Sequence, residues 1–154
     1  MSFILFMPLF SFAQNRNETT RNIDTLVSKI ERSFTKTPPQ SLIIPNNTSP
    51  ETYRYLVNHS KISFISIQYK TDSTAYEEKY YLDKENLIYT TLKETTYYNK
   101  DKMTWSGSFY FSNYKLIYYQ TLGHGKSETK DWDPQKEVLK KFDLRMNELK
   151  AKIK

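Results

Sequence analysis

The chain has 154 residues, with 23 Lys and Arg against 17 Asp and Glu, which gives a net charge of +6. This length fits one domain of the usual ~100 to 200 residues. There is no Cys and there are only 3 Gly, which excludes a disulfide scaffold, a thiolate metal site, a cysteine nucleophile and a glycine-rich phosphate loop. The 13 Tyr, 9 Phe and 2 Trp argue against intrinsic disorder.

Residues 1–13 (MSFILFMPLFSFA) have the pattern of a signal peptide. An uncharged apolar run ends at Phe10, and Ser11 and Ala13 place small residues where signal peptidase reads them, so cleavage is expected after Ala13. The run is shorter than the ~20 residues of a transmembrane helix. No Lys or Arg precedes it, which fits a chain whose true start lies slightly upstream. A buried N-terminal strand is the alternative.

Cleavage would leave residues 14–154 as a single domain without a transmembrane anchor. Export of a chain without Cys fits a bacterial periplasm or exterior, where disulfides are permitted but not required. We therefore expect an exported protein, periplasmic or extracellular.

Two stretches before residue 60 show helical patterns. Apolar side chains recur at helical spacing over residues 18–35, which predicts an amphipathic helix; they are Ile23, Leu26, Val27, Ile30 and Phe34. Residues 37–50 are rich in Pro and are expected to form a loop. Ser49 before Pro50 resembles an N-cap with Pro at the first helical position, so a short helix ending near His59 is expected.

The stretch from 61 to 122 is rich in Ile, Tyr, Phe and Thr, as strands are. About five strands are expected, at residues 61–70, 75–83, 86–98, 104–112 and 115–122. Segments 80–89 and 109–118 resemble each other and each predicts a hairpin with a two-residue turn. These turns place the pairs Leu82–Leu87, Tyr80–Tyr89, Phe111–Leu116, Phe109–Tyr118 and Tyr97–Trp105 on one apolar face.

The opposite face of this predicted sheet carries more aromatic residues than a solvated face needs. Contiguous exposed apolar surface marks interaction sites, so we expect this face to contact a partner through Tyr81, Tyr98, Tyr110, Ile117 and Tyr119. Two alternatives stay open. One or both helices could cover the face, or the Tyr and Thr residues could simply satisfy strand propensity.

A second helix is expected from Pro134 to the C-terminus, with Asp133 as its N-cap. Its apolar stripe is Leu139, Phe142, Met146, Leu149 and Ile153. The predicted fold class is therefore α+β: an antiparallel meander of about five strands flanked by an N-terminal and a C-terminal helix.

The sequence contains no recognisable catalytic constellation. His124, Asp131 and Asp133 could be drawn as a metal site, but the two Asp residues fit a helix start, where the dipole stabilises carboxylates. Glu78 would be notable if it projected from the core side with a perturbed pKa. No catalytic residue, metal ion or cofactor is predicted.

The positive charge is spread over the predicted helices. Basic against acidic residues number 5 to 3 in residues 14–36, 9 to 8 in residues 37–123 and 9 to 6 in residues 124–154. Nucleic-acid binders show a clustered basic face, so no nucleic-acid partner is expected. The expected partner is another envelope protein or a polyanionic glycan or lipid.

These features predict a non-catalytic binding module of the cell envelope or exterior that uses an aromatic sheet face. A small exported hydrolase with carboxylates in a cleft between sheet and helix is one alternative. A structural or assembly subunit with a long unpaired sheet edge is the other.

Overall fold

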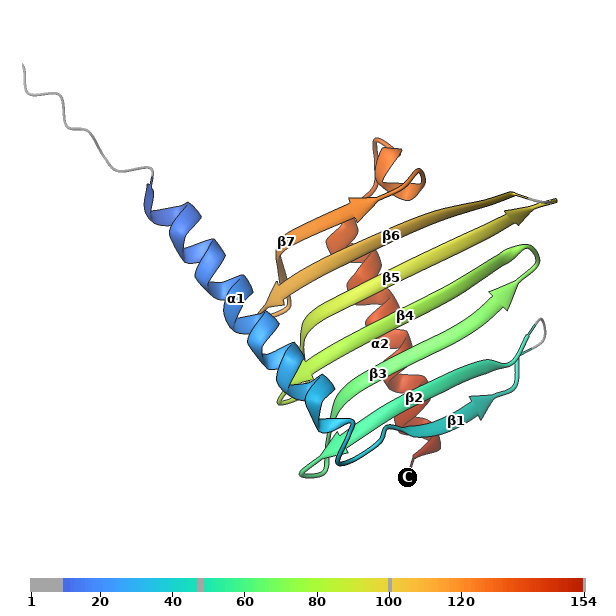
Figure 1. Cartoon of the computed structure of the whole chain (residues 1–154), viewed down its shortest axis with the longest axis horizontal. Helices are drawn as coiled ribbons and strands as arrows, with labels where there is room; N and C mark the ends of the chain where they lie inside the picture. The colour runs from blue at the N-terminus through green and yellow to red at the C-terminus, as the bar shows by residue number, and fades with distance from the viewer. Residues whose placement is uncertain (1–9, 47–48, 100, 154) are drawn as a thin grey trace, which may run out of the picture.

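The computed structural model describes residues 10–46, 49–99 and 101–153. A seven-stranded antiparallel sheet lies between two helices, one on each face (Figure 1). The strands follow one another across the sheet in chain order, as a meander. The elements are α1 (Phe10–Ser33), β1 (Gln40–Ile44), β2 (Glu51–Asn58), β3 (Lys61–Thr71), β4 (Thr74–Asp83), β5 (Asn86–Tyr98), β6 (Asp101–Ser112), β7 (Lys115–Leu122), the 3-10 turn η1 (Lys126–Glu128) and α2 (Pro134–Lys152).

The α+β class and the two terminal helices are confirmed, but the sheet has two more strands than the five predicted. The stretch expected to be a loop contains β1, and the stretch expected to be a short helix is β2. The helix prediction was wrong because Tyr53, Tyr55 and Val57 alternate toward the core at the two-residue period of a strand. Tertiary burial of this face outweighs the local helix-start signal of Ser49 and Pro50.

The predicted signal peptide overlaps the start of α1, and its residues 1–9 lie outside the described residues. Cleavage after Ala13 therefore stays a prediction. Within the described part of the chain, neither helix is apolar enough over a sufficient length to cross a lipid bilayer.

The hairpins β2–β3, β4–β5 and β6–β7 share one construction. Both residues of each two-residue turn have positive φ: His59 and Ser60, Lys84 and Glu85, and Asn113 and Tyr114. This is the pattern of a type I′ turn, whose twist matches that of the strands. Three residues after each turn the second strand contains one extra residue, a β-bulge, at Ser63, Ile88 and Ile117.

The bulges explain which predicted strand pairs were wrong. Leu82–Leu87 and Phe111–Leu116, on the turn side of the bulges, are confirmed. Beyond the bulges the register moves by one residue, so Tyr80 faces Thr90 and Phe109 faces Tyr119. The predicted pair Tyr97–Trp105 is also wrong, because Tyr97 faces Lys102 and Trp105 faces Glu94. A one-residue slip moves a side chain to the other face.

The main core lies between the sheet and α2. Tyr53, Ile65, Ile67, Tyr80, Leu92, Phe109 and Phe111 contribute from the strands, and Val138, Phe142, Met146 and Leu149 contribute from α2. Asp133 caps α2 as predicted, because its carboxylate accepts the backbone N–H of Lys136 at 3.0 Å. The buried stripe of α2 also includes Arg145, which the sequence did not predict.

A smaller aromatic row holds α1 on the other face. One residue from each of six neighbouring strands aligns across the sheet: Leu56, Phe64, Tyr81, Tyr89, Tyr110 and Tyr118. Neighbouring rings in the row lie 4.7 to 5.7 Å apart between centroids. Phe34 of α1 extends the row through Phe64. Figure 1 shows α1 crossing one end of the sheet, and the rest of this face has no described helix over it.

Candidate functional site

The structure distributes the five predicted contact residues over both faces of the sheet. Tyr81 and Tyr110 lie in the row beneath α1, and their hydroxyls donate to Glu31 at 2.7 Å and to Asp24 at 2.9 Å. Tyr119 lies on the α2 side, stacked on Phe109. Tyr98 is exposed at the end of β5, and Ile117 is the half-buried bulge residue of β7. The five side chains therefore do not form one surface, and their role in binding stays a prediction.

The uncovered part of the α1 side is polar and positively charged. The strand register and the alternation of side chains place five basic residues on it: Arg54, Lys70, Lys79, Lys93 and Lys102. We call this surface the cationic face. Glu77 is the one acidic strand residue that joins them among the described residues. Ser and Thr side chains occupy many of the remaining positions, among them Ser66, Thr91, Thr95, Thr104, Ser106 and Ser108.

The strand acids lie mainly on the opposite side. Glu51, Glu78 and Glu94 face α2. The segments after β7 supply their counter-ions: Arg145 bonds Glu51 and Glu78, and Lys126 contacts Glu94 at 2.5 Å. The basic and acidic residues of the strands nearly cancel in number, but the basic side chains lie mainly on the α1 side and the acidic side chains mainly on the α2 side. The acids are neutralised by cations outside the sheet, so four of the five cations of the cationic face have no ion-pair partner among the described residues.

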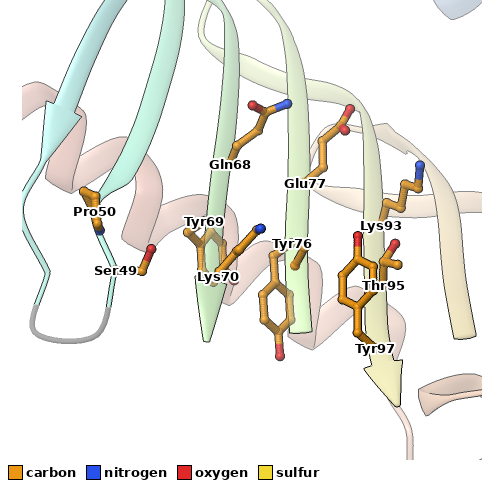
Figure 2. A pocket seen from close by; sticks show the side chains of 11 residues that line it. Ser49, Pro50, Gln68, Tyr69, Lys70, Tyr76, Glu77, Lys93, Thr95 and Tyr97 are labelled. Atoms are coloured by element: carbon orange, nitrogen blue, oxygen red, sulfur yellow. The ribbon is translucent and has the colours of Figure 1, made fainter. Parts of the chain in front are cut away.

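A shallow depression of about 410 Å³ lies on the cationic face across β3, β4 and β5. Figure 2 shows Gln68, Glu77, Lys93 and Tyr97 among the side chains that line it. Lys79 forms an ion pair with Glu77 at 2.9 Å, with both side chains partly exposed. Ammonium groups, an amide, hydroxyls and an exposed aromatic ring are together suited to an anionic ligand that also carries hydroxyl groups.

A second polar cluster is buried between the sheet and α2 around Arg145. Its Nε donates to Glu78 at 3.1 Å, and its Nη1 donates to Glu51 at 2.8 Å and to Glu148 at 3.0 Å. Nη1 also lies 3.2 Å from the hydroxyl of Tyr53, which donates to Glu148. This is the place in which the hydrolase alternative expects paired carboxylates.

The carboxylate of Glu78 is fully occupied by neighbours. One oxygen accepts from Tyr69 at 2.9 Å and Lys141 at 3.3 Å, and the other accepts from Tyr80 at 2.9 Å and Arg145 at 3.1 Å. Burial by itself would raise the pKa of Glu78, but the charges of Lys141 and Arg145 and the hydrogen bonds from Arg145 and Tyr80 lower it overall. A buried, ionised and saturated carboxylate stabilises the packing of α2 and offers no free lone pair to a substrate.

The free energy of unfolding is expected to fall as the pH drops below the ordinary Glu pKa of ~4.3. Because the folded-state pKa of Glu78 is lowered, its contribution is complete above the unfolded-state value and disappears as the pH falls through the folded-state value. Urea unfolding followed between pH 7 and about pH 3 measures this loss. The Glu78→Gln variant should show a flatter acid limb, and an identical limb in both proteins would contradict the assignment.

Three further features bear on the predicted alternatives. His124 contacts Glu128 at 2.6 Å, and Asp133 is engaged as the helix cap. Among the described residues, no group of three or more His, Asp or Glu side chains is arranged to hold a metal ion. At the sheet edge, β7 pairs with β6 alone within the described chain, and its Leu116 N–H donates to Gln135 at 2.9 Å.

Sequence reasoning singled out Glu78 but missed its partners. Arg145 follows Phe142 by three residues and precedes Leu149 by four, so its place inside the apolar stripe of α2 was a detectable signal. No comparable signal marked the cationic face, because assigning its residues to one side requires the bulges. No protein-family model, curated protein or solved structure matches this chain, so its function is inferred from its own residues.

Proposed function

We propose that the protein is a non-catalytic binding module that holds an acidic glycan on its cationic face. The observation that carries this proposal is the sorting of charge between the two sides of the sheet. Five basic residues and one acidic residue share the uncovered side, whereas the acids on the covered side are neutralised by Arg145, Lys141 and Lys126.

The spacing of the cationic face favours an extended ligand. Neighbouring strands lie ~4.8 Å apart and alternate residues along a strand lie ~6.7 Å apart, so cations on β2 to β6 cover several strand widths. Each exposed ion pair contributes at most about 1 kcal/mol, so useful affinity requires several at once. A linear polymer with repeated acidic groups can make them, and its binding should weaken with added salt.

The chemistry of the face favours a glycan over a lipid surface. The amide of Gln68 and the hydroxyls of Thr91, Thr95 and Thr104 stand between the cations and are at least partly exposed, and such groups can hydrogen-bond to sugar hydroxyls. The exposed apolar side chains on this side do not form one contiguous patch: Ile43 lies on the edge strand β1, Leu122 on the edge strand β7, and Tyr97 beside the depression.

Binding of dextran sulfate and of polygalacturonate, with neutral dextran as the reference polymer, tests the proposal. Lys70→Gln combined with Lys93→Gln should weaken binding of both acidic polymers by about tenfold or more, because two ion pairs are lost. The matched control removes two exposed lysines from α2, Lys136→Gln with Lys140→Gln, and should change affinity by less than about twofold. Equal weakening by both double variants would show attraction to net charge alone and overturn the proposal.

A further inference from the structure

A groove at the other end of the molecule is lined by one helix and two hairpin turns. The C-terminal half of α1 forms one wall, and the β2–β3 and β4–β5 turns form the other. Figure 1 shows this end of α1 beside those turns. The groove has a volume of about 470 Å³, within the range of small-molecule sites. It shares no lining residue with the depression on the cationic face.

The apolar side chains of the groove come from α1. Ile62 and Leu82 also line its base, but they are almost fully buried because their side chains belong to the main core on the α2 side of the sheet. Ile30 and Leu26 of α1 line the wall, and Leu26 remains 36 % exposed although it belongs to the apolar stripe of the helix. An apolar side chain of an amphipathic helix is normally covered by the sheet on which the helix packs. Leu26 is instead turned toward the groove, where an apolar ligand would remove it from water.

The rim of the groove is positively charged. Lys29, Lys61 and Lys84 line it, and none of the three forms an ion pair within the described chain. Asp83 is the one acidic lining residue, and His59 is exposed beside it. Lysine can lay its aliphatic stem along apolar surface while its ammonium group stays at the edge. The rim therefore complements a negative head group above an apolar chain.

We propose that this groove binds a single-chain amphiphile, with its acyl chain between α1 and the hairpin turns and its anionic head group at Lys29, Lys61 and Lys84. Because the groove is concave, it can enclose one acyl chain. A surface that docks on a bilayer would instead present protruding apolar residues. The proposal does not depend on the glycan-binding role of the cationic face, since the two sites use different residues.

Isothermal titration with sodium decanoate below its micellar concentration tests the site. Decanoate should bind with a stoichiometry of one, and decyltrimethylammonium, which has the same chain length and the opposite charge, should bind at least about tenfold more weakly. Lys61→Gln with Lys84→Gln should weaken decanoate binding by about tenfold. Leu26→Ser should weaken both amphiphiles, and Asp83→Asn should strengthen decanoate binding because it removes the opposing charge.

The control variant Lys70→Gln with Lys93→Gln should bind decanoate as the unchanged protein does, even where it has lost dextran sulfate. This contrast separates failure of the groove from failure of the cationic face. Thermal unfolding of each groove variant checks that the fold is retained. Decanoate binding that is insensitive to the groove variants, equal affinity for the cationic amphiphile, or binding to anionic phosphatidylglycerol vesicles without binding to monomeric decanoate would each overturn the proposal.

Discussion

Replacing Arg145 by Ala is expected to lower the free energy of unfolding by about 3–5 kcal/mol. The guanidinium contacts Glu78, Glu51 and Glu148, and both Glu78 and Glu51 are buried. Removing the cation would leave two carboxylates out of water without their main partner, and an uncompensated buried charge is costly. Lys141 remains near Glu78 at 3.3 Å and should moderate the loss without replacing the contact with Glu51.

Two further substitutions separate charge from geometry. Arg145→Lys keeps the positive charge but cannot bridge Glu51 and Glu78 through separate nitrogens, so it should remain clearly destabilised. The matched control is Lys150→Ala, which removes an exposed pair with Glu85 at 3.1 Å and should cost less than about 1 kcal/mol. Urea unfolding at neutral pH measures all three variants. An Arg145→Ala protein as stable as Lys150→Ala would contradict the central role of the cluster.

Replacing Phe109 by Ala is expected to destabilise the protein by about 3–5 kcal/mol, the usual range for a buried Phe. Phe109 is completely buried in the main core. Its ring stacks on Tyr119 with centroids 6.1 Å apart and meets Trp132 edge-on at 6.3 Å. The ring also covers Gly107, where an added Cβ would lie 2.6 Å from it. Losing the ring would therefore open a cavity between β6, β7 and the segment that leads into α2.

The control for this prediction is Tyr97→Ala on the cationic face. Tyr97 is 50 % exposed, so truncating it should change the free energy of unfolding by about 0.5 kcal/mol or less. Chemical denaturation provides the comparison, and Phe109→Leu should lie between the two because it fills part of the cavity. A loss below about 1 kcal/mol for Phe109→Ala would show that the core under β6 is not closed as described.

Local signals in the sequence predicted most of the elements. The strands from β3 to β7 begin and end close to the predicted bounds, and the cap of α2 at Asp133 is confirmed. These elements were predictable because alternation, turn residues and capping act over a few neighbouring positions. The failure at β2 has the same origin, since Ser49 and Pro50 give a local helix-start signal that only the packing of Tyr53 and Tyr55 outweighs.

The faces of the sheet could not be predicted from the same signals. A single extra residue at Ile88 or Ile117 reverses the alternation beyond it, and bulges have no reliable signature in one sequence. The predicted pairs Tyr80–Tyr89 and Phe109–Tyr118 failed for this reason. The predicted contact residues Tyr81 and Tyr119 consequently lie on opposite sides of the sheet.

The sequence by itself determined an α+β fold held together without disulfides, because hydrophobic periodicity and the absence of Cys depend on composition and short-range order. Only the tertiary structure decided where the charges go. Residues 37–123 have nearly balanced charge along the chain, yet folding places Glu51 and Glu78 beneath α2 and Lys70 and Lys93 on the uncovered face. The physical reason is burial: an acid can be covered only where a cation such as Arg145 is covered with it, and that partner lies far away in sequence.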